Sequence, residues 1–238
     1  MEWPLHHAHP WDLPEDQARA VQQHLRHYVR AEPLAWQQVR WVGGVDVSVR
    51  GDQLRAGIVV YDCAQGRVVD RAAAEGPEPI PYKPGFLSFR EIPRILDALP
   101  RLHRRPEVLL VDGHGIAHPR HMGIAAHLGV LLDWPTVGVA KSPLVGHFAR
   151  PLKPERGDAV PVLWRGQTLG MAVRTRTDVK PVWVSIGHRV TLPDAVALVL
   201  RCSRYRLPEP IRAAHRWAAQ WGVFDVPDGE DETADERG

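Results

Sequence analysis

Two aspartates lie inside apolar runs that are far apart in the sequence, Trp41–Ser48 around Asp46 and Val108–Gly115 around Asp112. Aliphatic residues fill most other positions of both runs, which is typical of strands inside a sheet. A carboxylate at such a place is costly to bury unless something pairs with it. A divalent cation held between Asp46 and Asp112 would be that partner, so the two runs predict a metal-dependent enzyme.

A third acid, Glu91, follows a proline-rich segment at 77–85. On local spacing, Ser88 and Glu91 form a capping box, in which the serine caps a helix and the glutamate reaches back to it. Alternatively, Glu91 faces Asp46 and Asp112, and a first-turn glutamate can satisfy both descriptions. Three carboxylates suit Mg²⁺ or Mn²⁺. Such a site can activate a water and neutralise charge on a phosphodiester.

Histidines follow the second run in a glycine-rich segment. His114 and His118 are four residues apart, the spacing of a zinc pair on a helix. Gly113, Gly115 and Pro119 favour a loop, which would spoil that spacing. We therefore expect backbone amides of the loop to face a ligand, with His118 close to a phosphate. A tight strand-to-helix turn without a ligand is the plain alternative.

Lys141 directly follows another apolar run, 135–140. An ammonium group at a strand end near acids can hold a phosphate or pair with a carboxylate. The alternative is an ordinary surface lysine. His6, His7 and His9 form an N-terminal cluster that we expect to be exposed, and we assign it no role.

The composition predicts one large domain with a sizeable core, because the chain has 238 residues and 44% apolar content. Cys63 and Cys202 offer neither a disulfide framework nor zinc-site spacing, so a reducing cytoplasm fits. The N-terminus lacks a signal-peptide pattern, and no stretch approaches the roughly 20 apolar residues of a membrane span. We expect a cytoplasmic protein with no membrane contact.

The net charge of +2 hides an asymmetry. Residues 225–238 hold seven acids and one base, and the remainder carries 29 Lys and Arg against 21 Asp and Glu. A basic body suits a polyanion such as nucleic acid, although a solvated surface would have the same composition. We expect one catalytic domain over residues 1–224 and a disordered acidic tail over 225–238.

Periodicity and turn residues predict the elements that must position these side chains. The predicted strands cover 38–49, 54–61, 67–73, a run ending at Asp112, 135–140, 159–164, 168–174 and 182–186. The predicted helices cover about 12–30, 89–102, 120–132, 192–202 and 209–220, the first opened by Asp12 near the cap position. This order is an α/β layered fold with a mixed sheet. A ribonuclease H-like arrangement has the same order and places the first and fourth strands side by side, which would bring Asp46 and Asp112 together.

Five segments, taken together, resemble the endonuclease V family, which nicks nucleic acid near hypoxanthine, the deaminated form of adenine. They are Gly43–Ser48, Pro81–Glu91, Val111–Pro119, Gly138–Lys141 and Tyr205–Pro210, and the resemblance covers roughly residues 9–220. It implies a ribonuclease H-like mixed sheet flanked by helices.

The resemblance also implies roles for individual residues. Asp46, Glu91 and Asp112 would bind Mg²⁺, with Mn²⁺ as a substitute. Lys141 would lie near the scissile phosphate, and His215 stands where some members have a histidine near the metal. Tyr82 would be a wedge that enters the duplex beside the lesion. The other residues expected to contact nucleic acid are Pro81, Gly85, Leu87, Gly113, His114, Gly115, Ile116 and His118, with the base pocket formed by backbone around Gly85, Leu87, Gly113 and Ile116.

The activity implied by the resemblance is hydrolysis of the second phosphodiester bond 3′ to hypoxanthine, leaving 3′-hydroxyl and 5′-phosphate ends, in DNA or RNA. We expect a monomer whose basic residues, such as Arg90, Lys141 and Arg189, hold the backbone, so that binding falls with salt. The alternatives are a junction resolvase on the same fold, a non-catalytic nucleic-acid-binding module, and a zinc hydrolase that uses His114 and His118.

Overall fold

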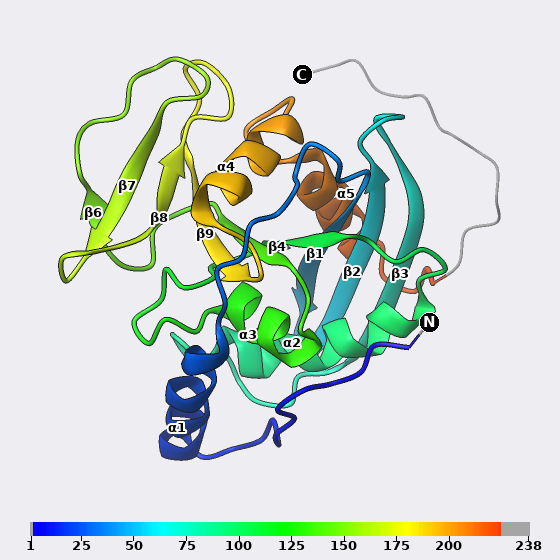
Figure 1. The fold of residues 1–238 in the computed structure, drawn as a ribbon. Helices are drawn as coiled ribbons and strands as arrows, with labels where there is room; N and C mark the ends of the chain where they lie inside the picture. Colours follow the sequence, from blue (N-terminus) through cyan, green and yellow to red (C-terminus); the bar gives the residue numbers. More distant parts are fainter. Residues whose placement is uncertain (1, 225–238) are drawn as a thin grey trace.

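The structure is a computed structural model that describes residues 2–224, so the predicted acidic tail at 225–238 lies outside the described residues. Within them, nine strands form one sheet in the order β3-β2-β1-β4-β5-β9-β8-β7-β6 (Figure 1). The strands are β1 (Trp41–Arg50), β2 (Gln53–Asp62), β3 (Arg67–Pro77), β4 (Val108–Asp112), β5 (Thr136–Ala140), β6 (His147–Phe148), β7 (Ala159–Trp164), β8 (Gln167–Val173) and β9 (Val182–His188). The helices are α1 (Glu15–Leu25), α2 (Leu87–Ala98), α3 (Ile124–Leu132), α4 (Leu192–Arg201) and α5 (Glu209–Ala218), with 3₁₀ turns η1 (Arg26–Tyr28) and η2 (Leu99–Arg101).

The predicted mixed sheet is confirmed. β1 runs parallel to β4 and β4 parallel to β5, whereas the other neighbours are antiparallel. Val45 pairs with Val111 in the β1–β4 register. Asp46 and Asp112 are the next residues on these two strands, so the predicted juxtaposition of the two apolar runs is also confirmed.

Helices cover both faces of the sheet (Figure 1). Val45 and Val111 pack with α2 and α3 on one face, and Val42 and Leu110 pack with α4 on the other. Successive strand residues point to opposite faces. Asp46 and Asp112, each following a residue of the α2 face, therefore point toward the face covered by α4 and α5.

Several predicted boundaries shift for local reasons. α1 ends at Leu25 and continues as the 3₁₀ turn η1, and its N-cap is Pro14 with no side-chain cap, so Asp12 does not cap it. α3 begins at Ile124 rather than near residue 120, because the preceding segment turns at His121 with a φ of 56°. The two-residue strand β6 was not predicted, since so short a strand leaves no periodicity to detect.

The two cysteines are free thiols, but the fold brings them into contact. The Sγ atoms of Cys63 and Cys202 lie 3.8 Å apart, joining the turn after β2 to the end of α4. No helix within residues 2–224 has the length and apolar character required to cross a membrane.

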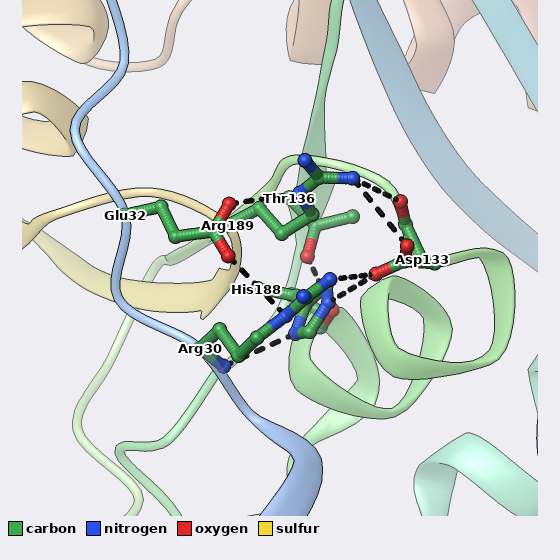
Figure 2. Close-up of polar contacts among 7 residues, drawn as sticks. Arg30, Glu32, Asp133, Thr136, His188 and Arg189 are labelled. Carbon is green, nitrogen blue, oxygen red and sulfur yellow. Dashed lines mark hydrogen bonds and ion pairs between the residues drawn. The ribbon is translucent and has the colours of Figure 1, made fainter.

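Arg30, Glu32, Asp133, His188 and Arg189 form a polar cluster at the end of α3 (Figure 2). Asp133, which ends α3 in a left-handed conformation, accepts from Arg30, from His188 at 3.0 Å and from Arg189 at 3.4 Å. His188 pairs with the first residue of β5, whereas Lys141 follows its last residue, a separation of roughly 15 Å along the strand. Arg189 therefore lies away from the aspartates, paired with Glu32 and Asp133, and its contact with the nucleic-acid backbone stays a prediction.

Candidate active site

Asp46 and Asp112 each hold one cationic or cation-forming side chain. Lys141 Nζ lies 2.5 Å from Asp112 Oδ2, and His215 Nδ1 lies 2.6 Å from Asp46 Oδ2. Both carboxylates are mostly buried: the side chain of Asp112 is 12% exposed and that of Asp46 is 11% exposed. Their partners are more exposed, Lys141 at 43% and His215 at 62%. The structure thus brings together four of the residues that were predicted to act as one site.

Small residues on β1 and β2 let α5 carry His215 to Asp46. A Cβ atom on Gly44 would lie 2.0 Å from the backbone oxygen of Pro210, at the start of α5. A Cβ atom on Gly57, which pairs with Asp46, would lie 2.6 Å from the nitrogen of Ala218, at the end of α5. The helix therefore lies directly against bare backbone on the face toward which Asp46 points.

Glu91 lies on α2 and approaches the two aspartates from the other face of the sheet. The pKa of Glu91 is raised to about 8, mainly by burial and then by the charges of Asp46 and Asp112, against the opposing effect of Arg90. Burial and then the charge of Asp46 also raise the pKa of Asp112, against the opposing effect of Lys141. The three acids therefore repel one another.

The donor set fits a hard divalent cation, because a cation would relieve this repulsion and all three donors are carboxylate oxygens. Lys141 and His215 each engage only the Oδ2 atom of their aspartate. Among residues 2–224, however, no three His, Cys, Asp or Glu side chains converge closely enough to form a complete set of metal ligands. Asp46 and Asp112 form the close pair, and Glu91 lies within electrostatic reach of them.

Ser88 does not cap α2, so the predicted capping box is wrong: the N-cap is Phe86, without a side-chain bond. The Ser88 hydroxyl instead lies 2.9 Å from Nδ1 of fully buried His127, whose Nε2 lies 2.7 Å from Nε2 of His9. His9 Nδ1 donates to the Pro10 oxygen at 2.7 Å. Its Nε2 must then accept from His127, which in turn accepts from Ser88. All three groups are neutral, and His9, to which no role was assigned, helps to fix the start of α2.

We expect acid to destabilise the protein through His127. Burial holds the pKa of His127 well below its usual 6.5, so below pH 6.5 the unfolded chain takes up a proton that the native state refuses. The unfolding free energy should fall by up to about 1.4 kcal/mol per pH unit for this residue. Urea denaturation at pH 7 and pH 5 measures the slope. In the variant His127→Gln, the slope of unfolding free energy against pH should be smaller by the equivalent of about one proton. His24→Gln, on the exposed side of α1, is the matched control. An unchanged slope in His127→Gln would contradict this account.

His118 holds the Tyr82 loop (residues 80–86). Its Nε2 donates to the Gly85 oxygen at 3.1 Å, and its Nδ1 accepts from the backbone of Arg120 at 3.2 Å. Arg120 and Gln22 donate to the same oxygen, at 2.6 and 3.0 Å. Burial, followed by the charge of Arg120, lowers the pKa of His118 to about 3. With both ring nitrogens engaged, His118 is not available to coordinate zinc, which disfavours the zinc-pair alternative. Its closeness to a phosphate stays a prediction.

The predicted glycine-rich loop is confirmed, but its amides point into the protein. Gly113, Gly115, Ile116 and His118 donate their backbone N–H groups to Val139 O, Ser185 Oγ, Ile186 O and Ile116 O respectively. The tight packing explains Gly115, where a Cβ atom would lie 1.9 Å from the Ile186 oxygen. These four amides therefore do not face a ligand, and the alternative of a tight strand-to-helix turn describes the loop.

The remaining predicted contacts lie around this loop and the Tyr82 loop. Tyr82 is 56% exposed, the most exposed large apolar side chain among residues 2–224, and lies 5.8 Å from the Arg90 guanidinium. Arg90 itself is paired with Glu78 at 2.6 Å. Pro81 is exposed, Leu87 and Ile116 are half-buried, and His114 is half-buried with an Nδ1 atom that makes no hydrogen bond.

Sequence reasoning missed Gln22 and Arg120, which hold the Gly85 oxygen, and His127, which bonds Ser88 at the start of α2. Each belongs to an element distant in sequence from the group it holds, such as Gln22 on α1 against Gly85. Local spacing contains no information on such contacts. The paired apolar runs around Asp46 and Asp112, and Lys141 after the next apolar run, could be recognised without the fold.

Comparison with known proteins shows the family to which this chain belongs. The family model for Endonuclease V matches residues 23–216. Endonuclease V of the cyanobacterium Trichormus variabilis is 46% identical over 218 residues, which cover 90% of this chain and 98% of that protein.

Solved structures agree. Endonuclease V of Streptomyces avermitilis superposes with a TM-score of 0.84 at 42% identity, covering 92% of this chain and 96% of its own. Endonuclease V of Ciona intestinalis, solved with a 24-mer DNA that contains an inosine followed by a ribo-adenosine, superposes with a TM-score of 0.73 at 29% identity, covering 85% and 95%. The chain, with its ribonuclease H-like sheet and adjacent aspartates, therefore belongs to the endonuclease V family of nucleases.

Proposed function

We propose that the enzyme recognises hypoxanthine in nucleic acid and hydrolyses the second phosphodiester bond on its 3′ side, leaving 3′-hydroxyl and 5′-phosphate ends. The observation that carries this proposal is the adjacency of Asp46 and Asp112, each bonded to a group that can carry positive charge. The Ciona relative bound to inosine-containing DNA supports the choice of lesion. Residues 1–224 would act as one catalytic unit, as a monomer in the cytoplasm.

Asp46 and Asp112 would hold Mg²⁺, with Mn²⁺ as a substitute and Glu91 close to both. When bound, the cation would lower the pKa of a water and offset charge on the phosphate. Lys141 has three N–H donors, of which one engages Asp112. Its partly exposed ammonium group can therefore donate to a phosphate oxygen. His215, on the solvent side of Asp46, orients that carboxylate through Nδ1.

The Tyr82 loop would serve lesion recognition. Prolines on both sides of the Tyr82–Lys83 pair restrict the backbone, so an exposed ring can be held out at small entropic expense. The ring would fill the space left by the extruded base. Since Gln22, His118 and Arg120 fix the Gly85 oxygen, the base pocket beside Gly85 and Gly113 would be preformed.

Tyr82→Ala should therefore weaken binding to an inosine duplex by about tenfold, because one stacked base contributes roughly 1–3 kcal/mol. Fluorescence anisotropy with Ca²⁺ in place of Mg²⁺, after checking that no cleavage occurs, measures this affinity. Tyr28→Ala removes an exposed ring from η1, far along the chain, and is the control. Unchanged lesion affinity in Tyr82→Ala would count against the wedge.

The function is tested by incubating the protein and Mg²⁺ with matched DNA and RNA strands that carry either inosine or adenosine, and mapping both product ends. Cleavage at the second bond 3′ to inosine alone is the expected result. Preferential cutting of a four-way junction would favour a resolvase, and Mg²⁺-independent binding without cleavage would favour a non-catalytic module.

A further inference from the structure

The loop between α4 and α5 presents an aromatic ring that the mechanism so far does not use. Tyr205 is 48% exposed, although it is a large aromatic residue. The guanidinium carbon of Arg212 lies 3.9 Å from the centre of its ring, and that of Arg176 lies 6.0 Å away. The ring is therefore held by one close cation and has a second cation beside it.

This ring is tied to both aspartates through its neighbours. Arg212 lies one helical turn before His215 on α5, and residues three apart share a helix face. His215 in turn bonds Asp46. On the other side, Arg206 Nη2 donates to the Lys141 oxygen at 2.6 Å, and Lys141 bonds Asp112.

The ring also lies on the other side of the site from the lesion-binding residues. The Tyr82 loop leads into α2, which covers one face of the sheet together with α3. The Tyr205 loop leads into α5, which lies on the opposite face (Figure 1). Ile211 of α5 packs there with residues of α4. A nucleic-acid strand with its lesion beside Tyr82 and a phosphate at Asp46 and Asp112 would pass the ends of the central β-strands. It would then continue toward Tyr205.

We propose that Tyr205 stacks on the base of the nucleotide that directly follows the scissile phosphate, with Arg212 as a positioning residue for the ring. An exposed aromatic face with arginines beside it is complementary to a nucleotide, which offers a flat base and an anionic phosphate. Glu209 accepts from Arg212 at 2.9 Å, which fixes the guanidinium group against the ring. This inference rests on the proposed function, because the direction of the strand is set by the lesion site.

The test is a double-mutant cycle between protein and substrate. Wild type and Tyr205→Ala are compared on two inosine strands. One is intact, and the other has an abasic sugar as the nucleotide that follows the cut, so the phosphodiester is kept and only the base is lost. We expect Tyr205→Ala to raise KM about tenfold on the intact strand with little change in kcat. The KM of wild type should rise by a similar factor on the abasic strand. The KM of Tyr205→Ala on the abasic strand should be no higher than the KM that results from either change alone.

If the two changes instead raise KM by factors that multiply, the side chain and the base act independently. That result would overturn the proposal and show that Tyr205 supports only the loop. Tyr205→Phe should recover the coupling because it keeps the ring, whereas Tyr205→Leu should not; equal behaviour of the two variants would also overturn it. Tyr28→Ala on the intact strand controls for loss of an exposed tyrosine. Wild-type cleavage at the mapped bond without coupling rejects this inference alone. The absence of any inosine-dependent cleavage by wild type rejects the proposed function itself, and the inference with it.

Discussion

Asp112→Asn is expected to reduce cleavage of an inosine-containing strand by about a thousandfold or more, while the fold persists. The substitution keeps the shape of the side chain and removes one of two adjacent charges that would hold the cation. Losing a group that stabilises transition-state charge alone typically reduces the rate by roughly 10²–10³. Loss of bound metal would add to that effect. Single-turnover cleavage with saturating enzyme measures the chemical step directly.

Thermal stability separates a site effect from misfolding in this variant. Burial and then Asp46 raise the pKa of Asp112, so ionising this carboxyl group costs more in the native state than in the unfolded chain. Removing the charge should leave the Tm unchanged or higher. Asp52→Asn, in the turn between β1 and β2, is the matched control and should keep full activity. Appreciable cleavage by a folded Asp112→Asn variant would refute the assigned role.

Gly44→Ala should damage the site without touching any group that we assign to chemistry. The new Cβ atom would lie 2.0 Å from the Pro210 oxygen and 2.3 Å from its carbon, which are backbone atoms that cannot rotate away. The start of α5 must therefore move, and His215 moves with it away from Asp46. We expect the unfolding free energy to fall by about 2–3 kcal/mol. Cleavage should fall at least tenfold, measured at a temperature where the variant remains folded.

Gly43→Ala is the matched control for this effect. Its Cβ atom would point to the other face of the sheet and meet side-chain atoms, Leu109 Cδ2 at 2.4 Å and Pro106 Cγ at 3.0 Å. The Leu109 side chain can adjust, and α5 is not displaced. We expect a loss of stability with cleavage largely retained. Equal loss of cleavage in the two variants would show that the position of α5 does not matter.

The central pair of the site could be predicted because its evidence is written along the chain. Aliphatic runs around Asp46 and Asp112 indicate strands, and the order of elements indicates that those strands are neighbours, which the register of β1 and β4 confirms. The same information placed Lys141 near the acids, since it directly follows the next parallel strand.

The supporting contacts could not be predicted, because they join elements through space. Ser88 has the right spacing for a helix cap, yet its hydroxyl bonds His127, 39 residues away. His118 follows a strand end as a phosphate ligand would, yet burial makes it neutral and Gly85 takes its N–H. Arg189 is basic like a backbone contact, yet it is paired with Glu32 and Asp133 at the far end of β5. In each case the residue type was recognised and the partner was supplied by tertiary structure.

Crystals grown with Mn²⁺ and measured near the manganese absorption edge test the central claim most directly. The account predicts an anomalous peak about 2–2.5 Å from a carboxylate oxygen of Asp46 and from one of Asp112, and the loss of that peak in Asp112→Asn. The contradicting result would be manganese bound elsewhere, with no density between these two carboxylates, in crystals whose protein is shown to cleave an inosine-containing strand.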